Sequence, residues 1–245
     1  MPYLMAGYPT LAQSGAALEA ALSVGVDLLE LGVPYSDPLA DGPVIHAAAS
    51  EALRAGTRLG DVLALAAEYS EAVPIVLMVY ANQLFAQGIE PFLERCAEAG
   101  VVGVIVPDLP AEEAEPVREA CARLGLALVM LVAPNTKPQR LAQIATVASG
   151  FLYAVSVLGT TGERSLEELR YREVVSLARS ASDLPVAVGF GVASAGHARA
   201  AVEAGADGVI VGSRLVRALG EHGPEGVRAA LEEVATGLGE LAARR

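Results

Sequence analysis

Short apolar runs of strand type alternate with segments of helical spacing, and this alternation restricts the possible folds more than any other feature. The runs are Tyr3–Ala6, Leu28–Leu31, Ile75–Tyr80, Gly103–Val106, Ala127–Leu131, Phe151–Ser156, Val186–Gly189 and Gly208–Val211. Apolar residues recur about every 3.6 positions in Ala17–Leu22, Leu59–Tyr69, Pro91–Ala99, Glu113–Leu124, Leu141–Val147, Tyr171–Ala178, Ala195–Ala204 and Val227–Leu241. Eight strands and eight helices in 245 residues predict a closed parallel (β/α)₈ barrel. An open doubly wound sheet is the alternative.

Composition narrows the class of protein. No linker or shift in composition divides residues 1–245, so we expect one domain. The net charge of -12 argues against nucleic acid as a partner, because such binding needs a basic surface. The two longest uncharged runs are too polar to predict a membrane span, and the first residues do not resemble a signal peptide. Together with Cys96 and Cys121, which suit buried thiols in a reducing compartment, this predicts a soluble cytoplasmic protein.

Two carboxylates mark the segment LLELGVPYSDPLADGP, residues 28–43. Glu30 interrupts an apolar run, and the segment holds no Lys, Arg or His to pair with it. We therefore predict Glu30 as a general acid/base with a raised pKa, and Asp41 as its companion carboxylate. Two alternatives remain open at this point. An arginine from a distant segment could pair with Glu30, and Asp41 could cap the helix that Pro43 opens.

Other polar residues lie where strands of a barrel would end, which is where barrel enzymes carry their chemistry. Tyr80 ends the third predicted strand and Tyr153 lies on the sixth, while Asp108 follows the fourth. Both tyrosines could instead be core aromatics, and Asp108 could be a turn residue.

Glycines gather after the last three predicted strands. They are Gly159 and Gly162 beside Thr161, then Gly189 and Gly191, then Gly212 before Ser213. Glycine lets backbone N–H groups approach an anion closely, and a helix N-terminus adds a favourable dipole. We therefore predict a site for a phosphate group.

The remaining residue types exclude other barrel chemistries. The single lysine, Lys137, lies in a polar segment, so a Schiff-base aldolase is disfavoured. His46, His197 and His222 are far apart without the spacing of metal ligands, so no metal is expected. What remains is carboxylate acid/base chemistry on a small phosphorylated substrate.

The motifs LELGVPYSDPLADGPVI, PYLMAGYP, VPDLP, YAVSVLGTTG, VGFGV and VGSRLV resemble the tryptophan synthase alpha subunit family from residue 3 to the end. The resemblance implies a barrel that cleaves indole-3-glycerol phosphate to indole and glyceraldehyde 3-phosphate without a cofactor of its own. It implies that Glu30 and Asp41 are catalytic. It implies substrate binding by Tyr3, Met78, Tyr80, Tyr153 and Thr161, and phosphate binding by Gly162, Gly191, Gly212 and Ser213.

The resemblance also implies a partner, a β-subunit that carries pyridoxal phosphate, in an α2β2 heterotetramer. Two departures from the family pattern are visible. The family's usual helix before the first strand is missing here, and His46 stands where glutamine is expected. Two other functions stay open: a non-catalytic barrel that regulates a partner, and another phosphosugar enzyme on the same fold.

Overall fold

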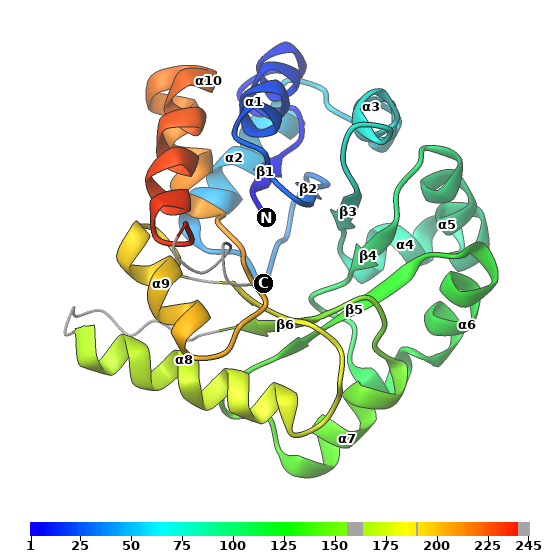
Figure 1. Ribbon diagram of the computed structural model, residues 1–245. Coiled ribbons are helices and arrows are strands. Elements are labelled where there is room, and N and C mark those ends of the chain that lie inside the picture. The colour runs from blue at the N-terminus through cyan, green and yellow to red at the C-terminus, as the bar shows by residue number, and fades with distance from the viewer. Residues whose placement is uncertain (156–163, 190, 240–245) are drawn as a thin grey trace.

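A single sheet of parallel strands forms the centre of the molecule. The structure is a computed structural model that describes residues 1–155, 164–189 and 191–239. Within this part, the strands are β1 (Tyr3–Met5), β2 (Leu29–Gly32), β3 (Ile75–Met78), β4 (Gly103–Ile105), β5 (Ala127–Val132), β6 (Leu152–Val155), β7 (Val186–Gly189) and β8 (Gly208–Val209). They pair in chain order (Figure 1). Tyr3 N–H donates to the Val211 carbonyl at 2.8 Å, which joins the last strand to the first. The sheet is therefore a closed barrel.

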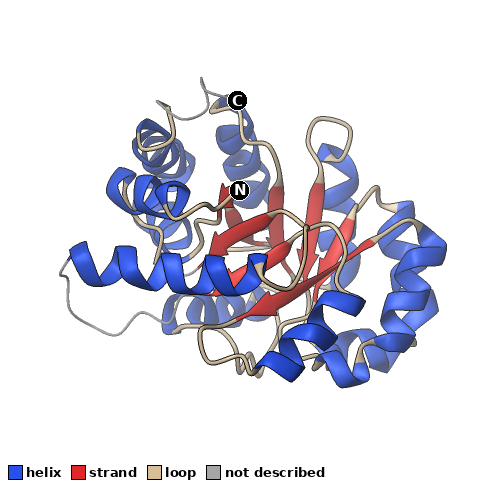
Figure 2. Ribbon diagram, turned by 60° about the horizontal axis from the view of Figure 1, so that its bottom comes forward, coloured by secondary structure: helices blue, strands red, loops and turns tan. Residues whose placement is uncertain are grey.

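Helices surround the strands, as Figure 2 shows from a second direction. They are α1 (Leu11–Ser23), α2 (Pro43–Arg54), α3 (Leu59–Tyr69), α4 (Ala81–Gln87), α5 (Ile89–Glu98), η1 (Ala111–Glu113), α6 (Glu115–Leu124), α7 (Pro138–Val147), α8 (Arg164–Arg179), α9 (Ala195–Glu203) and α10 (Ser213–Thr236). The predicted (β/α)₈ barrel is confirmed, and the open sheet is wrong.

Alternate residues of each strand face opposite sides, which divides the core in two. Leu29, Leu31 and Leu77 belong to the large cluster between the sheet and the helices. Val76 and Ile105 belong to a smaller cluster inside the barrel. Near-continuous apolar strands are required because both faces of the sheet are buried.

Predicted strand boundaries agree within two residues, but several helices differ. Helices α1 and α8 begin six and seven residues before the predicted segments, and α2 was expected only as the helix that Pro43 opens. Helix α4 was not predicted, because its seven residues ANQLFAQ are too short and polar for a clear helical period. The predicted helix Val227–Leu241 is part of a longer α10 that begins at Ser213 and ends at Thr236. A kink divides α10 at Gly223, whose φ of 65° favours glycine, and Pro224 follows it.

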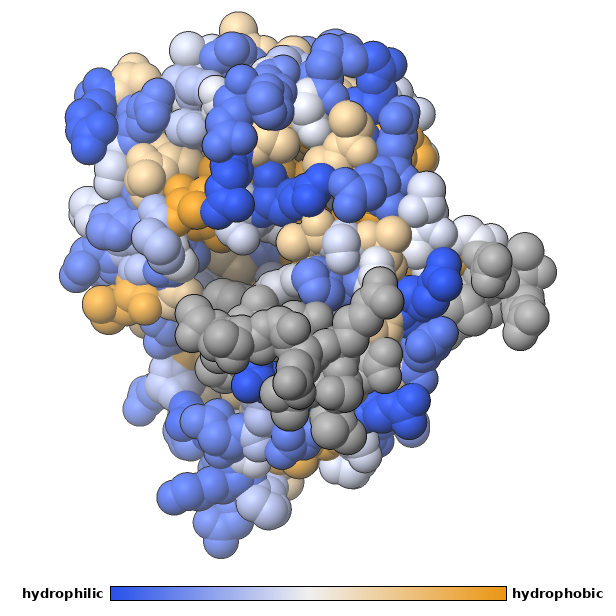
Figure 3. All heavy atoms as spheres, turned by 90° about the vertical axis from the view of Figure 1, so that its left-hand side faces the viewer, coloured by the Kyte–Doolittle hydropathy of each residue, from blue (hydrophilic) through white to orange (hydrophobic). Residues whose placement is uncertain are grey.

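Figure 3 shows the face of the molecule over α9 and α10, which is largely hydrophilic with small separate apolar areas. Among the helices of the described residues, none combines the length and the hydropathy that a membrane span requires.

Candidate functional site

Glu30 projects from β2 into the barrel, with only 1% of its surface exposed. Its neighbours in register are Tyr3 on β1 and Val76 on β3. Neither carboxylate oxygen has a hydrogen-bond partner among the described residues, so the arginine pair considered from the sequence is not found there. Burial raises the pKa of Glu30 to about 8, with the Met1 amino group opposing and Asp41 adding to the rise. Glu30 is therefore a buried acid that holds its proton at neutral pH.

Asp41 lies in the loop between β2 and α2, directly before Gly42. Gly42 occupies the N-cap position of α2, so the interpretation of Asp41 as a helix cap is wrong. Burial raises the pKa of Asp41 to about 6, while a hydrogen bond with Tyr80 and the charge of His46 lower it. The two carboxyls thus differ in pKa by about two units, as expected of an acid and an ionised partner.

Tyr80 follows β3 and is 3% exposed. Its hydroxyl accepts a hydrogen bond from the Ala40 N–H at 3.1 Å, next to its bond with Asp41. The next residue, Ala81, donates its N–H to Asp108 Oδ1 at 2.8 Å. Asp108 is thus more than a turn residue, because its carboxylate joins the loop after β4 to the turn after β3.

Tyr3 and Tyr153 enter the barrel from β1 and β6, and both are buried. A Cβ on Gly32 would lie 2.2 Å from the Tyr3 hydroxyl oxygen, and one on Gly189 would lie 2.2 Å from the Tyr153 ring. Glycine at these two strand positions makes room for the rings. Burial raises the pKa of each hydroxyl, and nearby carboxylates raise it further.

These side chains meet at one end of the barrel interior. Both tyrosine hydroxyls experience the charges of Glu30 and Asp41. Met78, at the end of β3, packs against the interior cluster and also against the cluster that contains Tyr3. The structure therefore brings together six of the predicted residues: Glu30, Asp41, Tyr3, Met78, Tyr80 and Tyr153.

The predicted phosphate residues lie at the ends of later strands. Gly191 follows β7 with a φ of 84°, a conformation that favours glycine. Gly212 is the N-cap of α10 and Ser213 is its first residue, so the amides of a helix N-terminus are placed there. Thr161 and Gly162 lie outside the described residues.

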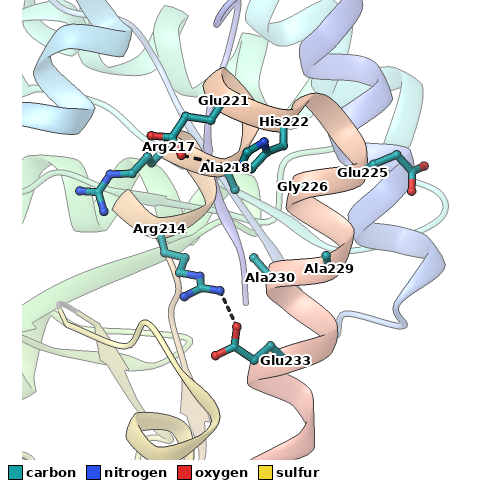
Figure 4. A pocket seen from close by; sticks show the side chains of 10 residues that line it. All are labelled: Arg214, Arg217, Ala218, Glu221, His222, Glu225, Gly226, Ala229, Ala230 and Glu233. Carbon is teal, nitrogen blue, oxygen red and sulfur yellow. Dashed lines mark hydrogen bonds and ion pairs between the residues drawn. The ribbon is translucent and has the colours of Figure 1, made fainter.

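A groove of about 540 Å³ lies between the two halves of α10 (Figure 4). Arg214 forms an ion pair with Glu233 across it and donates a 2.9 Å hydrogen bond to the Ala193 carbonyl. Arg214 thereby joins the start of α10 to the loop after β7. Half of the residues that line this groove are Arg or Glu, which differs from the apolar wall expected of a site for a small molecule.

A second hollow, of about 590 Å³, lies at the ends of β4, β5 and β6 and is lined in part by Leu131, Val155, Lys137 and Arg140. Neither Glu30 nor Asp41 contributes to this lining. In the described part of the chain, no three His, Cys, Asp or Glu side chains are grouped so that they could hold a metal ion.

Sequence reasoning missed the contacts that hold the loop of Asp41. Tyr35 stacks on Tyr80 with ring centroids 5.0 Å apart. Asn82 donates to the Tyr35 hydroxyl at 3.1 Å, and Gln83 donates to a loop carbonyl at 3.0 Å. Glutamine three residues after the helix cap at Tyr80 is one half of a capping box, and this is the only sequence signal that could have indicated Gln83.

A closed parallel barrel with ionisable side chains gathered where its strands end places the chain among the (β/α)₈-barrel enzymes. The profile of the family described as tryptophan synthase alpha chain matches residues 1–244. The tryptophan synthase alpha chain of Synechococcus elongatus is 48% identical over 236 residues, which cover 96% of this chain and 89% of the relative. The chain belongs to the tryptophan synthase alpha chain family.

Solved structures agree with this assignment. A tryptophan synthase from Mycobacterium tuberculosis is 43% identical with a TM-score of 0.89, covering 96% of this chain and 90% of the other. A tryptophan synthase complex from Pyrococcus furiosus is 35% identical with a TM-score of 0.86, covering 97% and 96%.

Proposed function

We propose that Glu30 and Asp41 carry out the cleavage of indole-3-glycerol phosphate to indole and glyceraldehyde 3-phosphate, the alpha reaction of tryptophan biosynthesis. The chain is a lyase of this type by its family. The residue assignment rests on the carboxyl of Glu30. It is buried inside the barrel, and no cationic side chain of the described residues pairs with it. A buried acid of this kind is costly to a fold and is therefore a functional candidate.

Glu30 acts as the general acid and then as the general base. Breaking the carbon–carbon bond requires a proton on indole C3, and the raised pKa of Glu30 keeps that proton available at neutral pH. The resulting carboxylate accepts the proton of the side-chain hydroxyl while that carbon becomes an aldehyde. The bonding electrons return to the indole ring, and Glu30 ends the cycle protonated.

Asp41 stabilises the intermediate in which the indole nitrogen is positive. It accepts a hydrogen bond from the indole N–H and must be ionised to oppose the developing charge. The Tyr80 hydroxyl supports this state, since its hydrogen bond lowers the pKa of Asp41.

The substrate spans the barrel mouth in this proposal. Tyr3, Met78 and Tyr153 contact the indole ring, and their position around Glu30 supports this. The phosphate binds to backbone N–H groups of Gly162, Gly191, Gly212 and Ser213. Gly162 and the substrate-binding residue Thr161 lie outside the described residues. Residues 1–245 act as one barrel domain.

Incubation with indole-3-glycerol phosphate and measurement of released indole tests the proposal. Indole formation that depends on Glu30 supports it. Binding without turnover would instead favour a regulatory barrel, and isomerisation of another phosphosugar would favour a different enzyme.

The pH profile should be bell-shaped. We expect kcat/KM to be highest between about pH 6 and about pH 8, because Asp41 must be ionised and Glu30 protonated. Activity falls below this window as Asp41 gains a proton, and above it as Glu30 loses one. The substrate phosphate also titrates near pH 6. The pH profile of the residual activity of Asp41→Asn therefore serves as the control. A profile in which Asp41→Asn keeps the full acid limb would contradict the assignment to Asp41.

The phosphate site gives a second expected result. A Cβ on Gly212 would lie 3.6 Å from Tyr3 and 3.7 Å from Ile45, so Gly212→Ala fits the fold but adds a methyl group beside the first amides of α10. We expect KM to rise roughly tenfold, the effect of weakening one charge-assisted hydrogen bond, with a smaller change in kcat. Gly60→Ala in α3 is the control, since its added Cβ meets open space. An unchanged KM for Gly212→Ala would place the phosphate elsewhere.

We further propose a β-subunit that carries pyridoxal phosphate as the partner, in an α2β2 assembly. Two exposed apolar residues after strand ends support this, Leu39 at 83% and Phe85 at 47% exposure. Adding a cognate β-subunit and measuring indole formation and complex mass tests it. The buried free thiols of Cys96 and Cys121 support a cytoplasmic location.

A further inference from the structure

The loop that carries Asp41 is held along its length by the N-cap Tyr80 and the first turn of α4. At its beginning, the Pro34 carbonyl accepts a 3.0 Å hydrogen bond from Gln83 Nε2. At its end, the Ala40 N–H donates to the Tyr80 hydroxyl at 3.1 Å, and Asp41 bonds to the same hydroxyl. The loop therefore cannot move away from this turn without breaking contacts at both ends.

The side-chain amide of Gln83 forms hydrogen bonds both to the start of α4 and to the loop that carries Asp41. Its Oε1 accepts the backbone N–H of Tyr80 at 3.3 Å, while its Nε2 donates to Pro34. The first bond fixes the backbone of Tyr80 at the start of α4, and the second fixes the loop relative to it. A side chain that only capped α4 would need the first bond alone.

The middle of the loop is held by an aromatic contact. The rings of Tyr35 and Tyr80 are stacked at 5.0 Å with an angle of 24° between their planes. The Tyr35 hydroxyl accepts a 3.1 Å hydrogen bond from Asn82. Residues 80, 82 and 83 lie within four positions at the start of α4, so a small shift of that first helical turn changes all of these contacts together.

We propose that Gln83 is a positioning residue for the alpha reaction, which sets the distance between the Tyr80 hydroxyl and Asp41 by joining the start of α4 to the loop at Pro34. The proposal rests on the function proposed above for Asp41. Gln83 contacts no reacting atom in this scheme and acts only through Tyr80 and the loop. Catalysis depends on such placement, since a misplacement of about 1 Å can cost roughly a hundredfold in rate.

Gln83→Met tests the proposal, since methionine has nearly the same length and forms neither hydrogen bond. We expect kcat to fall between about fivefold and about a hundredfold with little change in KM. The acid limb of the pH profile should also move to higher pH, because a loosened bond from Tyr80 stabilises ionised Asp41 less. Tyr35→Phe keeps the ring contact but loses the bond from Asn82, and it should show a smaller change in the same direction.

Gln83→Glu separates positioning from capping. Glutamate keeps an acceptor for the Tyr80 N–H and suits this position of a helix, but it cannot donate to the Pro34 carbonyl. We expect it to retain thermal stability while losing turnover, and Gln87→Glu, one turn further along α4, controls for the added charge. Gln83→Glu or Gln83→Met with parental kcat and pH profile would overturn the proposal, even if the melting temperature fell. If the Gln83 variants behave like the parent while Glu30→Gln is inactive in the same assay, only the proposal for Gln83 is wrong and the proposed function stands.

Discussion

Replacing Glu30 with glutamine is expected to lower kcat by roughly 10²- to 10⁴-fold, the usual contribution of a general acid/base. Glutamine keeps the size of the side chain but cannot transfer a proton to indole C3 or accept one from the hydroxyl. Substrate binding should change little, because the indole and phosphate contacts remain. Steady-state rates of indole release from indole-3-glycerol phosphate measure the effect.

The same variant should fold at least as well as the parent. The pKa of Glu30 is about 8 in the folded protein and 4.5 is its ordinary value, so the folded state binds more protons than the unfolded state between these values. The free energy of unfolding of the parent therefore falls as pH rises through this window. Glutamine removes that dependence.

Denaturant unfolding at about pH 5 and about pH 9 checks this result. The advantage of Glu30→Gln over the parent should be larger at the higher pH. Near-normal turnover in a folded Glu30→Gln protein would show that another group transfers the proton.

Replacing Asp41 with asparagine is expected to lower kcat by roughly 10²- to 10³-fold, a typical loss when electrostatic stabilisation of a transition state is removed. The amide can still accept a hydrogen bond from the indole N–H, but it has no charge to oppose the positive nitrogen. Single-turnover measurements with excess enzyme should show that the chemical step, rather than binding, is slowed.

Asp37→Asn is the matched control for Asp41→Asn, because it makes the same change four residues earlier in the loop. Asp37 is exposed, whereas burial raises the pKa of Asp41 to about 6. We expect Asp37→Asn to keep most of the activity of the isolated chain. If Asp37 proved indispensable and Asp41 did not, the roles assigned to this loop would be wrong.

The general form of the site could be predicted from the sequence for a simple reason. A carboxylate inside an apolar strand is costly, so Glu30 was recognisable without any structure. Glycines after successive strands likewise predict a phosphate site at Gly191 and Gly212, and that role stays a prediction. The alternative reading of Asp41 as a helix cap was wrong because helix capping depends on backbone geometry at Gly42, which residue types alone do not specify.

Two other features depend on contacts between distant segments. Asp108 reaches across 27 positions to Ala81, and Gln83 reaches across 49 to Pro34. Neither spacing leaves a periodic or local pattern in the chain. The role of such residues becomes visible only when the strands that carry them are placed side by side.

Apolar periodicity and the cost of burying charge act locally, so the number of strands, the barrel and the buried acid could be inferred from the order of residues alone. The folded structure was needed to find which side chains hold Asp41 in place and how far the pKa values of Glu30 and Asp41 are raised. Those properties depend on burial and on hydrogen bonds across the barrel mouth, and both arise only after the sheet has closed.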